Sequence, residues 1–304
     1  MDKFELNILG CGSAIPTSRF NPTSQVVNFR DKLYLIDCGE GAQLQMRLNK
    51  LKMNRLGHIF LSHLHGDHCF GLMGFISTLG LLDRSADLVI HAHPDAERIF
   101  RPQLDYFCAD LPFKVIFHHI APQKHELIHE ERNLKVYSLP LKHRVPTCGF
   151  LFEEQAKERH INREMAEFYK VPLRAYPDLK EGHDYVAEDG TVIANARLTR
   201  EAEPARKYAF CSDTAPTKAI IPWIEGVDLL YHEATFAESE VVRAKQTMHT
   251  TAAQAAEIAK EAQVKKLIIG HYSARYMDLS VLLHEAQAIF SNTHLGDEVS
   301  TVQI

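Results

Sequence analysis

The chain has 304 residues, of which 45% are hydrophobic and 24% charged, so it can bury a substantial core. Its formal net charge of −5 excludes a general attraction to RNA, so any nucleic-acid binding must come from a local basic surface. The sequence shows no secretory signal and no long apolar span, and its six cysteines lack CxxC spacing, so we expect a reduced, cytoplasmic protein without membrane contact.

Short strands alternate with helices along most of the chain, which predicts an α/β fold. Aliphatic and β-branched residues predict strands at Leu6–Gly10 and Leu33–Asp37. The periodicity of the first half predicts helices at Gly41–Leu51, Gly71–Leu82 and Pro94–Phe107. The second half adds predicted helices at Pro216–Ile224, Glu238–Gln246, Thr251–Ala262 and Leu279–Phe290.

The stretch from about residue 153 to 195 departs from this rhythm. It is dense in charge, contains Pro172 and Pro177, and predicts only one helix, around Asn162–Tyr169. We therefore predict a single domain over residues 1–304 that carries an insertion at about 153–195.

The hexapeptide His63-Leu64-His65-Gly66-Asp67-His68 follows the apolar run Ile59–Leu61. His63 and His65 alternate, so in an extended chain they point to one face, whereas Asp67 and His68 lie beyond Gly66, where a turn can redirect them. The motif therefore predicts the start of two metal sites. Imidazole and carboxylate ligands without thiolate favour Zn²⁺, with Mn²⁺ or Fe²⁺ as alternative occupants.

Further ligands are expected where a polar side chain directly follows an apolar strand. Three segments fit this pattern: Val136–Leu141 leads to His143, Tyr208–Ser212 leads to Asp213, and Leu267–Gly270 leads to His271. Strand ends of α/β proteins are where distant parts of the chain converge on one pocket. With the hexapeptide, the three segments supply seven candidate ligands.

The pattern H-x-H-x-D-H, followed by a distant His, Asp and His, resembles the metallo-β-lactamase fold superfamily over nearly the whole chain. The resemblance implies a four-layer αββα sandwich and two Zn²⁺ per subunit. It implies that one ion is held by His63, His65 and His143, the other by Asp67, His68 and His271, and that Asp213 bridges them. Two metal ions roughly 3.5–4 Å apart can clamp both the attacking and the leaving oxygen of a phosphodiester.

Three local motifs, Tyr231–Phe236, Met248–Thr251 and His271–Tyr276, resemble the ribonuclease Z family, whose members remove the 3′ trailer from precursor tRNA. The resemblance implies metal-activated attack by water, with Asp67 as ligand and general base, His249 as proton donor and Glu233 as the carboxylate that orients His249. A leaving ribose 3′-oxygen needs a proton, and a histidine held by a carboxylate can donate one near neutral pH. Ser273 and Arg275 are expected to contact phosphate.

The resemblance also implies precursor tRNA as the partner, a homodimer, and a protruding arm at about 153–195 that grips tRNA from the other subunit; no DNA partner is expected. One loop departs from the family pattern, because Phe20 stands where the family carries an arginine and Arg19 precedes it.

The sequence alone leaves two alternative functions open. A metallo-hydrolase of small phosphodiesters or other small molecules would use the same seven ligands, and a non-catalytic RNA-binding member would be expected to have lost some of them. His91 and His93 have the spacing of an H-x-H metal pair, but they end a short strand before Pro94 at a helix start, so they are interpreted as structural. The other histidines, among them His118 and His129, lack partners at ligand spacing and are interpreted as surface or core residues.

Overall fold

The computed structural model describes residues 2–298 and 300–304 and divides into two compact units. The first unit contains Met1–Glu130, Lys135–Phe152 and Lys207–Ile304, and the second contains Glu131–Leu134 and Glu153–Arg206. Every helix within the described part of the chain is too short or too polar to cross a membrane.

A seven-stranded mixed sheet forms one half of the first unit, in the order β18-β1-β2-β3-β4-β5-β6 among the described residues. Strands β1 to β3 pair antiparallel, and β3 to β6 pair parallel. Their bounds are β1 (Phe4–Gly10), β2 (Ser24–Phe29), β3 (Lys32–Ile36), β4 (Leu56–Phe60), β5 (Leu88–Ala92), β6 (Val115–His119) and β18 (Thr301–Gln303).

A second seven-stranded sheet has the order β17-β16-β15-β14-β9-β8-β7, again for the residues that are described. Strands β14 to β17 run parallel to one another. The bounds are β7 (Leu127–Glu131), β8 (Leu134–Pro140), β9 (Cys148–Glu154), β14 (Lys207–Cys211), β15 (Leu229–Glu233), β16 (Leu267–Gly270) and β17 (Thr293–Leu295).

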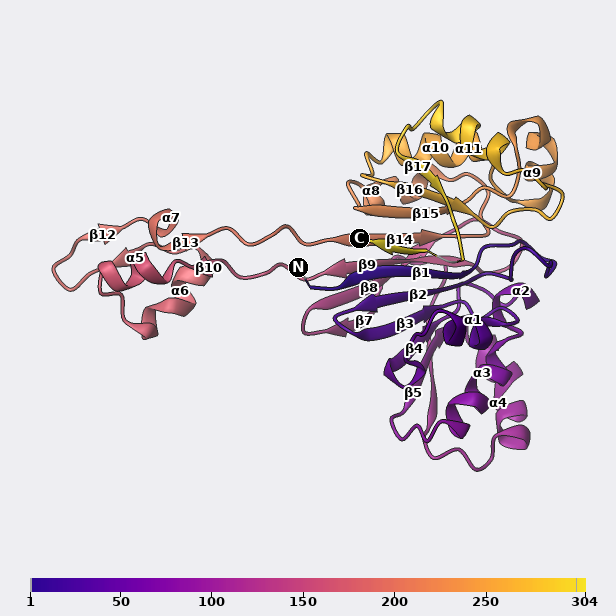
Figure 1. Cartoon of the computed structure of the whole chain (residues 1–304), viewed down its shortest axis with the longest axis horizontal. Coiled ribbons are helices and arrows are strands. Elements are labelled where there is room, and N and C mark those ends of the chain that lie inside the picture. Colours follow the sequence, from indigo (N-terminus) through magenta and orange to yellow (C-terminus); the bar gives the residue numbers. More distant parts are fainter. Residues whose placement is uncertain (1, 299) are drawn as a thin grey trace. The chain divides into compact units, whose positions relative to one another are not determined.

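Helices cover the outer faces of both sheets (Figure 1). Beside the first sheet lie η1 (Met53–Arg55), α1 (Ala42–Leu48), α2 (Gly66–Cys69), α3 (Leu72–Leu81) and α4 (Asp95–Phe107). Beside the second lie η3 (Lys218–Ile220), α8 (Ile221–Ile224), η4 (Glu238–Glu240), α9 (Val241–Thr247), α10 (Ala252–Glu261) and α11 (Ser280–Gln287). An apolar cluster that includes Leu35, Ile59, Phe75 and Ile90 joins the first sheet to its helices. The predicted αββα layer order is confirmed.

Two helices of the second half are shorter than predicted. The segment expected to be one helix at Pro216–Ile224 is a 3₁₀ turn followed by the four-residue α8, with Pro222 in its first turn. The ring of proline lacks an N–H and so fits the start of a helix rather than its interior. Helix α11 ends at Gln287, and the chain then turns so that Thr293 can pair with Leu267 of β16.

The second unit has a small apolar core of its own, formed by Ala166, Val171, Leu179, Ile193 and Leu198. Two short antiparallel pairs lie in it, β10 (His160–Ile161) with β13 (Thr199–Arg200) and β11 (Tyr185–Val186) with β12 (Val192–Ile193). Its helices are α5 (Arg163–Phe168), η2 (Leu173–Ala175), α6 (Tyr176–Glu181) and α7 (Asn195–Leu198).

The prediction of only one helix in this stretch is therefore wrong, since α6 and α7 accompany α5. Helices of four to six residues span less than two turns, so an apolar periodicity of 3.6 residues has no room to repeat. The sequence does carry signals for α6, namely Pro177 in its first turn and Gly182 at its end, where φ is 101°.

Candidate metal centre

The parallel strands bring chemically active side chains to a shared edge of each sheet. Asp37 directly follows β3 and His63 follows β4, whereas Glu233 ends β15 and His271 follows β16. The carboxyl ends of neighbouring parallel strands meet at the same edge, which is where α/β proteins place their sites. The backbone bond from Cys148 N–H to the Ser62 carbonyl, at 3.1 Å, ties the His63 segment to the second sheet.

The seven residues that the motifs predict as ligands fall into two adjacent groups. Within each group, one candidate ligand atom per residue lies within 4.8 Å of the others. The groups are His63, His65, His143 and Asp213, and Asp67, His68 and His271.

Asp213 lies between the two groups and faces each with a different oxygen. Its Oδ2 is 3.6 Å from His63 Nε2 and 3.8 Å from His143 Nε2. Its Oδ1 is 3.0 Å from His68 Nε2 and 3.1 Å from His271 Nε2. This is the arrangement that a carboxylate needs if it is to bridge two cations.

In four of these histidines, the ring nitrogen Nδ1 forms a hydrogen bond with a neighbouring group. The acceptors, at 2.7–3.1 Å, are Ser62 Oγ for His63, Asp37 Oδ2 for His68, the Met248 carbonyl for His143 and Thr235 Oγ1 for His271. A ring that donates from Nδ1 presents a lone pair at Nε2, as histidine ligands of metals commonly do.

The Nε2 atoms of these four rings are buried without a hydrogen-bond partner among the described residues. Although Asp213 Oδ1 lies only 3.0 Å from His68 Nε2, the two atoms are not aligned for a hydrogen bond. Buried, unpaired polar atoms are costly, and one cation in each of the two groups would satisfy all four. The residues present therefore fit a metal centre.

The charge states of the rings also suit cation binding. Burial lowers the pKa of His63, His65 and His143, so these rings are neutral near pH 7 and keep their lone pairs. Burial also opposes charge on His68, but Asp213 and Asp37 together raise its pKa. The proton on His68 balances the same carboxylate charge that a divalent cation would balance.

Asp37 is a functional residue that the sequence analysis missed. It is fully buried and accepts hydrogen bonds from Ser62 N–H at 2.7 Å, Ser62 Oγ at 2.8 Å and His68 Nδ1 at 2.7 Å. Asp37, Asp213 and His271 also have φ of 55°, 55° and 59°. Such strained conformations in non-glycine residues are concentrated at functional sites. The sequence pattern that predicted Asp213, a polar residue directly after an apolar strand, also occurs at Asp37.

His249 and Glu233 form a buried pair beside the candidate ligands. His249 Nδ1 lies 2.9 and 3.1 Å from the two carboxylate oxygens of Glu233. Glu233 also accepts the Thr214 N–H at 2.6 Å, the Thr250 N–H at 3.2 Å and the Thr235 hydroxyl at 2.6 Å. Burial disfavours charge on His249, but the Glu233 carboxylate outweighs it and raises the pKa of His249 to about 9.

Thr251 caps α10 through a capping box with Gln254. The helix start therefore accounts for Thr251 and leaves His249 available for another role.

The two residues predicted to contact phosphate lie together outside this buried pair. Arg275 Nε donates to Ser273 Oγ at 3.2 Å, and Arg275 Nη1 lies 2.7 Å from Glu240 Oε2. The guanidinium also lies over the Phe236 ring, 5.0 Å from its centroid. Arg275 therefore uses Nη1 for Glu240 and Nε for Ser273 in this structure.

The loop that contains Arg19 and Phe20 packs against the segment that follows His271. The ring centroids of Phe20 and Tyr272 are 5.6 Å apart, and the Arg19 guanidinium lies 4.8 Å from the Phe20 centroid. Arg19 also donates to the Met277 carbonyl. The arginine therefore remains tied to this face of the chain even though phenylalanine occupies the family position.

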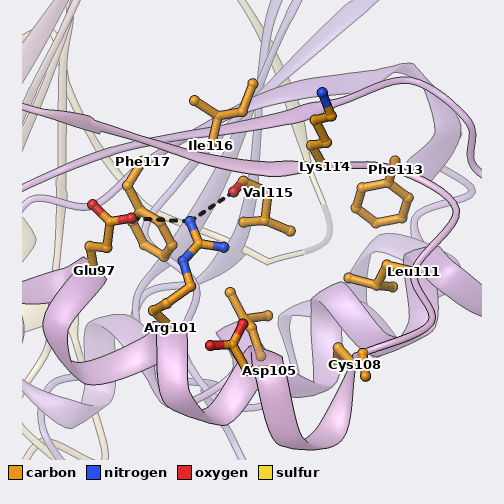
Figure 2. Close-up of a pocket in the computed structure, with 12 residues that line it drawn as sticks. Glu97, Arg101, Asp105, Cys108, Leu111, Phe113, Lys114, Val115, Ile116 and Phe117 are labelled. Atoms are coloured by element: carbon orange, nitrogen blue, oxygen red, sulfur yellow. Dashed lines mark hydrogen bonds and ion pairs between the residues drawn. The ribbon is translucent and has the colours of Figure 1, made fainter.

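A separate hollow of about 500 Å³ lies between α4 and β6 (Figure 2). Arg101 lies within it and donates to Glu97 at 3.1 Å and to the Val115 carbonyl at 3.0 Å. None of the predicted site residues lines this hollow. We place the chemistry at the histidine and aspartate groups, because those groups carry buried ligand atoms.

Known proteins share both the sequence and the fold of this chain. It is 60% identical over 298 residues to ribonuclease Z of Parabacteroides distasonis, with 98% of each chain covered. Its structure resembles the short form of human tRNase Z, with a TM-score of 0.72 at 24% identity and 99% of each chain covered. It also resembles the metallo-β-lactamase fold protein YhfI of Bacillus subtilis, with a TM-score of 0.69 at 19% identity and 100% of each chain covered. The family model described as Anti-Pycsar protein Apyc1 matches residues 4–157.

The fold and the paired ligand groups define a metallo-β-lactamase fold protein with a candidate metal centre. At this identity over nearly its whole length, the chain belongs to the ribonuclease Z family, as its motifs indicated. Through residues 4–157 it also belongs to the family described as Anti-Pycsar protein Apyc1. That matched range contains the hexapeptide and His143 but not Asp213, Glu233 or His249.

Proposed function

We propose that the chain is a metal-dependent endoribonuclease that removes the 3′ trailer from precursor tRNA. It would leave a 3′-hydroxyl on the tRNA and a 5′-phosphate on the trailer. Membership of the ribonuclease Z family supports this proposal. The observation that carries it is the His249–Glu233 pair, because a side-chain nitrogen of His249 lies within 4.8 Å of ligand atoms of Asp213 and His271.

The metal cofactor is proposed to be two Zn²⁺ per subunit. One would be held by His63, His65 and His143, the other by Asp67, His68 and His271, with Asp213 shared. Histidine and carboxylate donors suit Zn²⁺, with Mn²⁺ and Fe²⁺ as alternatives. When bound, such ions supply Lewis acidity at the phosphate and bring the pKa of a water molecule to about 7.

The protein's own groups divide the proton transfers between them. Burial opposes charge on Asp67, but the neighbouring His271 and His68 outweigh it and lower the pKa of Asp67, so its carboxylate is ionised. In this proposal the ionised carboxylate orients the attacking water and receives its proton. The Ala14 N–H donates to Asp67 Oδ2 at 2.9 Å and holds it in place. On the opposite side of the phosphate, His249 would donate its Nε2 proton to the leaving 3′-oxygen, since its Nδ1 is engaged by Glu233.

The second unit is proposed to bind the body of the tRNA. Arg163, Lys170 and Arg174 are exposed on it, and contacts of such side chains with phosphates are independent of sequence. We further propose that the enzyme is a homodimer, in which this arm grips tRNA bound to the other subunit, and that it acts in the cytoplasm, where precursor tRNA is its substrate.

The second candidate function is hydrolysis of a small phosphodiester on the same ligands. Residues 4–157 match a second family and include five of the seven proposed ligands, namely His63, His65, Asp67, His68 and His143, so these ligands alone do not specify a tRNA substrate. His249, which protonates a poor leaving group in the first proposal, and Glu233, which orients it, lie outside that range.

The two candidates are separated by giving the metal-loaded protein a trailer-bearing tRNA precursor and, separately, bis(p-nitrophenyl) phosphate, each with and without chelator. Chelator-sensitive cleavage of the precursor at the trailer boundary is the expected result. Hydrolysis of the small ester with an intact precursor would overturn the first proposal in favour of the second.

A further inference from the structure

Three histidines outside the candidate metal centre meet between the two sheets. His58 lies on β4, His91 on β5 and His129 on β7, so the first two come from one sheet and the third from the other. One ring nitrogen from each lies within 4.8 Å of those of the other two. His58 lies within β4, whereas His63 lies three residues beyond the end of that strand.

We propose that His58, His91 and His129 form a second metal site, independent of the candidate catalytic centre, that binds one Zn²⁺ per chain. His58 Nδ1 and His91 Nε2 are 3.1 Å apart. Two imidazole nitrogens bound tetrahedrally to one Zn²⁺ at about 2.0–2.1 Å are roughly 3.3 Å from each other. The observed spacing is therefore close to what a shared ion requires.

A fourth histidine sets the orientation of His91. His118, on the neighbouring strand β6 and in register with His91, places its Nδ1 3.3 Å from His91 Nδ1. If His91 donates from Nδ1 to His118, its Nε2 carries a lone pair that points toward His58. An outer partner that fixes the tautomer in this way is typical of histidine ligands. His118 thus acts as a positioning residue, and water would complete the coordination.

The surroundings favour a neutral His91 ring and leave part of the cluster accessible. Burial, followed by the neighbouring rings of His58, His118 and His129, lowers the pKa of His91 to about 2. The Phe60 ring stacks on His91 with centroids 4.4 Å apart, so the cluster has an apolar wall. His91 is buried, whereas His58 and His129 are half-buried and His118 is exposed. Three imidazole ligands with one open position form a recognised Zn²⁺ donor set.

A bound ion would join the two sheets through three side chains, because His129 belongs to the second sheet and the other two to the first. The rival explanation is a ladder of hydrogen bonds in which one proton lies between His58 and His91 and another between His91 and His118. The ladder needs no ion, so counting bound metal distinguishes the two.

The test is the number of Zn²⁺ ions per chain after saturation and exhaustive dialysis, measured by plasma mass spectrometry. We expect three in the wild-type protein and two in His58→Gln and in His129→Gln, with tRNA-precursor cleavage retained. His119→Gln is the matched control, because His119 follows His118 on β6 and pairs with Glu97 at 2.9 Å, outside the cluster. Two or fewer ions in the wild type, or three in both cluster variants, would overturn the proposal.

A variant of the candidate catalytic centre, with the cluster left intact, makes the test independent of the proposed function and of how well the cluster variants fold. In His63→Ala/His68→Ala/Asp213→Ala, which leaves only two candidate ligands in each group of the candidate centre, the cluster should still bind one Co²⁺ with the visible absorption of a tetrahedral site. Zn²⁺ should also raise the melting temperature of that variant. Loss of all tight metal binding in this background would refute the second site, whatever the enzyme cleaves.

Discussion

Substitution of His249 by alanine tests the proton-transfer step of the proposed reaction most directly. The change removes the ring whose Nδ1 lies 2.9 Å from Glu233 Oε1 and whose other nitrogen is free to donate. A positioned general acid contributes about 10²–10⁴-fold to a rate, so RNA cleavage in single-turnover reactions should fall by that factor. Metal content and tRNA affinity should be nearly unchanged, because His249 is not among the seven proposed ligands.

The leaving group provides an internal control for this substitution. A ribose 3′-oxygen needs a proton as it departs, whereas nitrophenolate is stable as an anion and leaves without one. His249→Ala should therefore reduce hydrolysis of bis(p-nitrophenyl) phosphate by less than about tenfold while RNA cleavage falls by about 10²–10⁴-fold. An equal loss on both substrates would mean that His249 maintains the site rather than donating the proton. Wild-type cleavage of RNA would exclude any catalytic part for it.

Glu233→Gln is a less clean probe of the same pair. Oε1 accepts the Thr214 N–H at 2.6 Å and Oε2 accepts the Thr250 N–H at 3.2 Å, so either orientation of the amide sets an NH₂ group against a donor. A buried donor left without a partner costs about 1–3 kcal/mol, so the variant should lose stability as well as rate. The double variant should lose little more activity than His249→Ala alone, because residues that act as one unit are non-additive.

Four further outcomes are expected. Asp213→Ala should lose bound metal, since its two oxygens face different histidine pairs; retention of two equivalents in the candidate centre would exclude a bridging role. Asp37→Asn should weaken metal affinity by about 10–100-fold in chelator competition, because the Asp37 carboxylate holds His68, and unchanged affinity would contradict this. Replacing Ala156–Pro204 with a short linker should weaken precursor binding but spare hydrolysis of the small ester, and loss of both in a folded protein would argue against an RNA-binding arm. In metal-free protein, His249 has a raised pKa, so the stability it contributes is complete below pH 6.5 and is lost as pH rises through about 9; a pH-independent difference in unfolding free energy between wild type and His249→Ala would refute this assignment.

The sequence was most informative where ligands are close together or follow a strand. His63 to His68 form one short motif, and Asp213 and His271 each stand just past an apolar strand, so the parallel pairing of those strands brings them together. The layer order also followed from the family resemblance and the alternation of strands with helices.

Other features depend on contacts that sequence spacing does not reveal. His58, His91 and His129 come from three strands of two sheets, so no local motif links them. Asp37 acts through His68, which is 31 residues away. The pairing of Arg275 with Glu240 likewise depends on how η4 and the segment after β16 pack.

The measurement that tests the central claim most directly is single-nucleotide mapping of a cleaved tRNA precursor, with analysis of both new ends. The wild-type protein with Zn²⁺ should cut once at the trailer boundary and leave a 3′-hydroxyl on the tRNA and a 5′-phosphate on the trailer. Chelator or the Asp213→Ala substitution should abolish the cut. A 2′,3′-cyclic phosphate on the tRNA, or cleavage that persists in Asp213→Ala, would contradict hydrolysis at this centre.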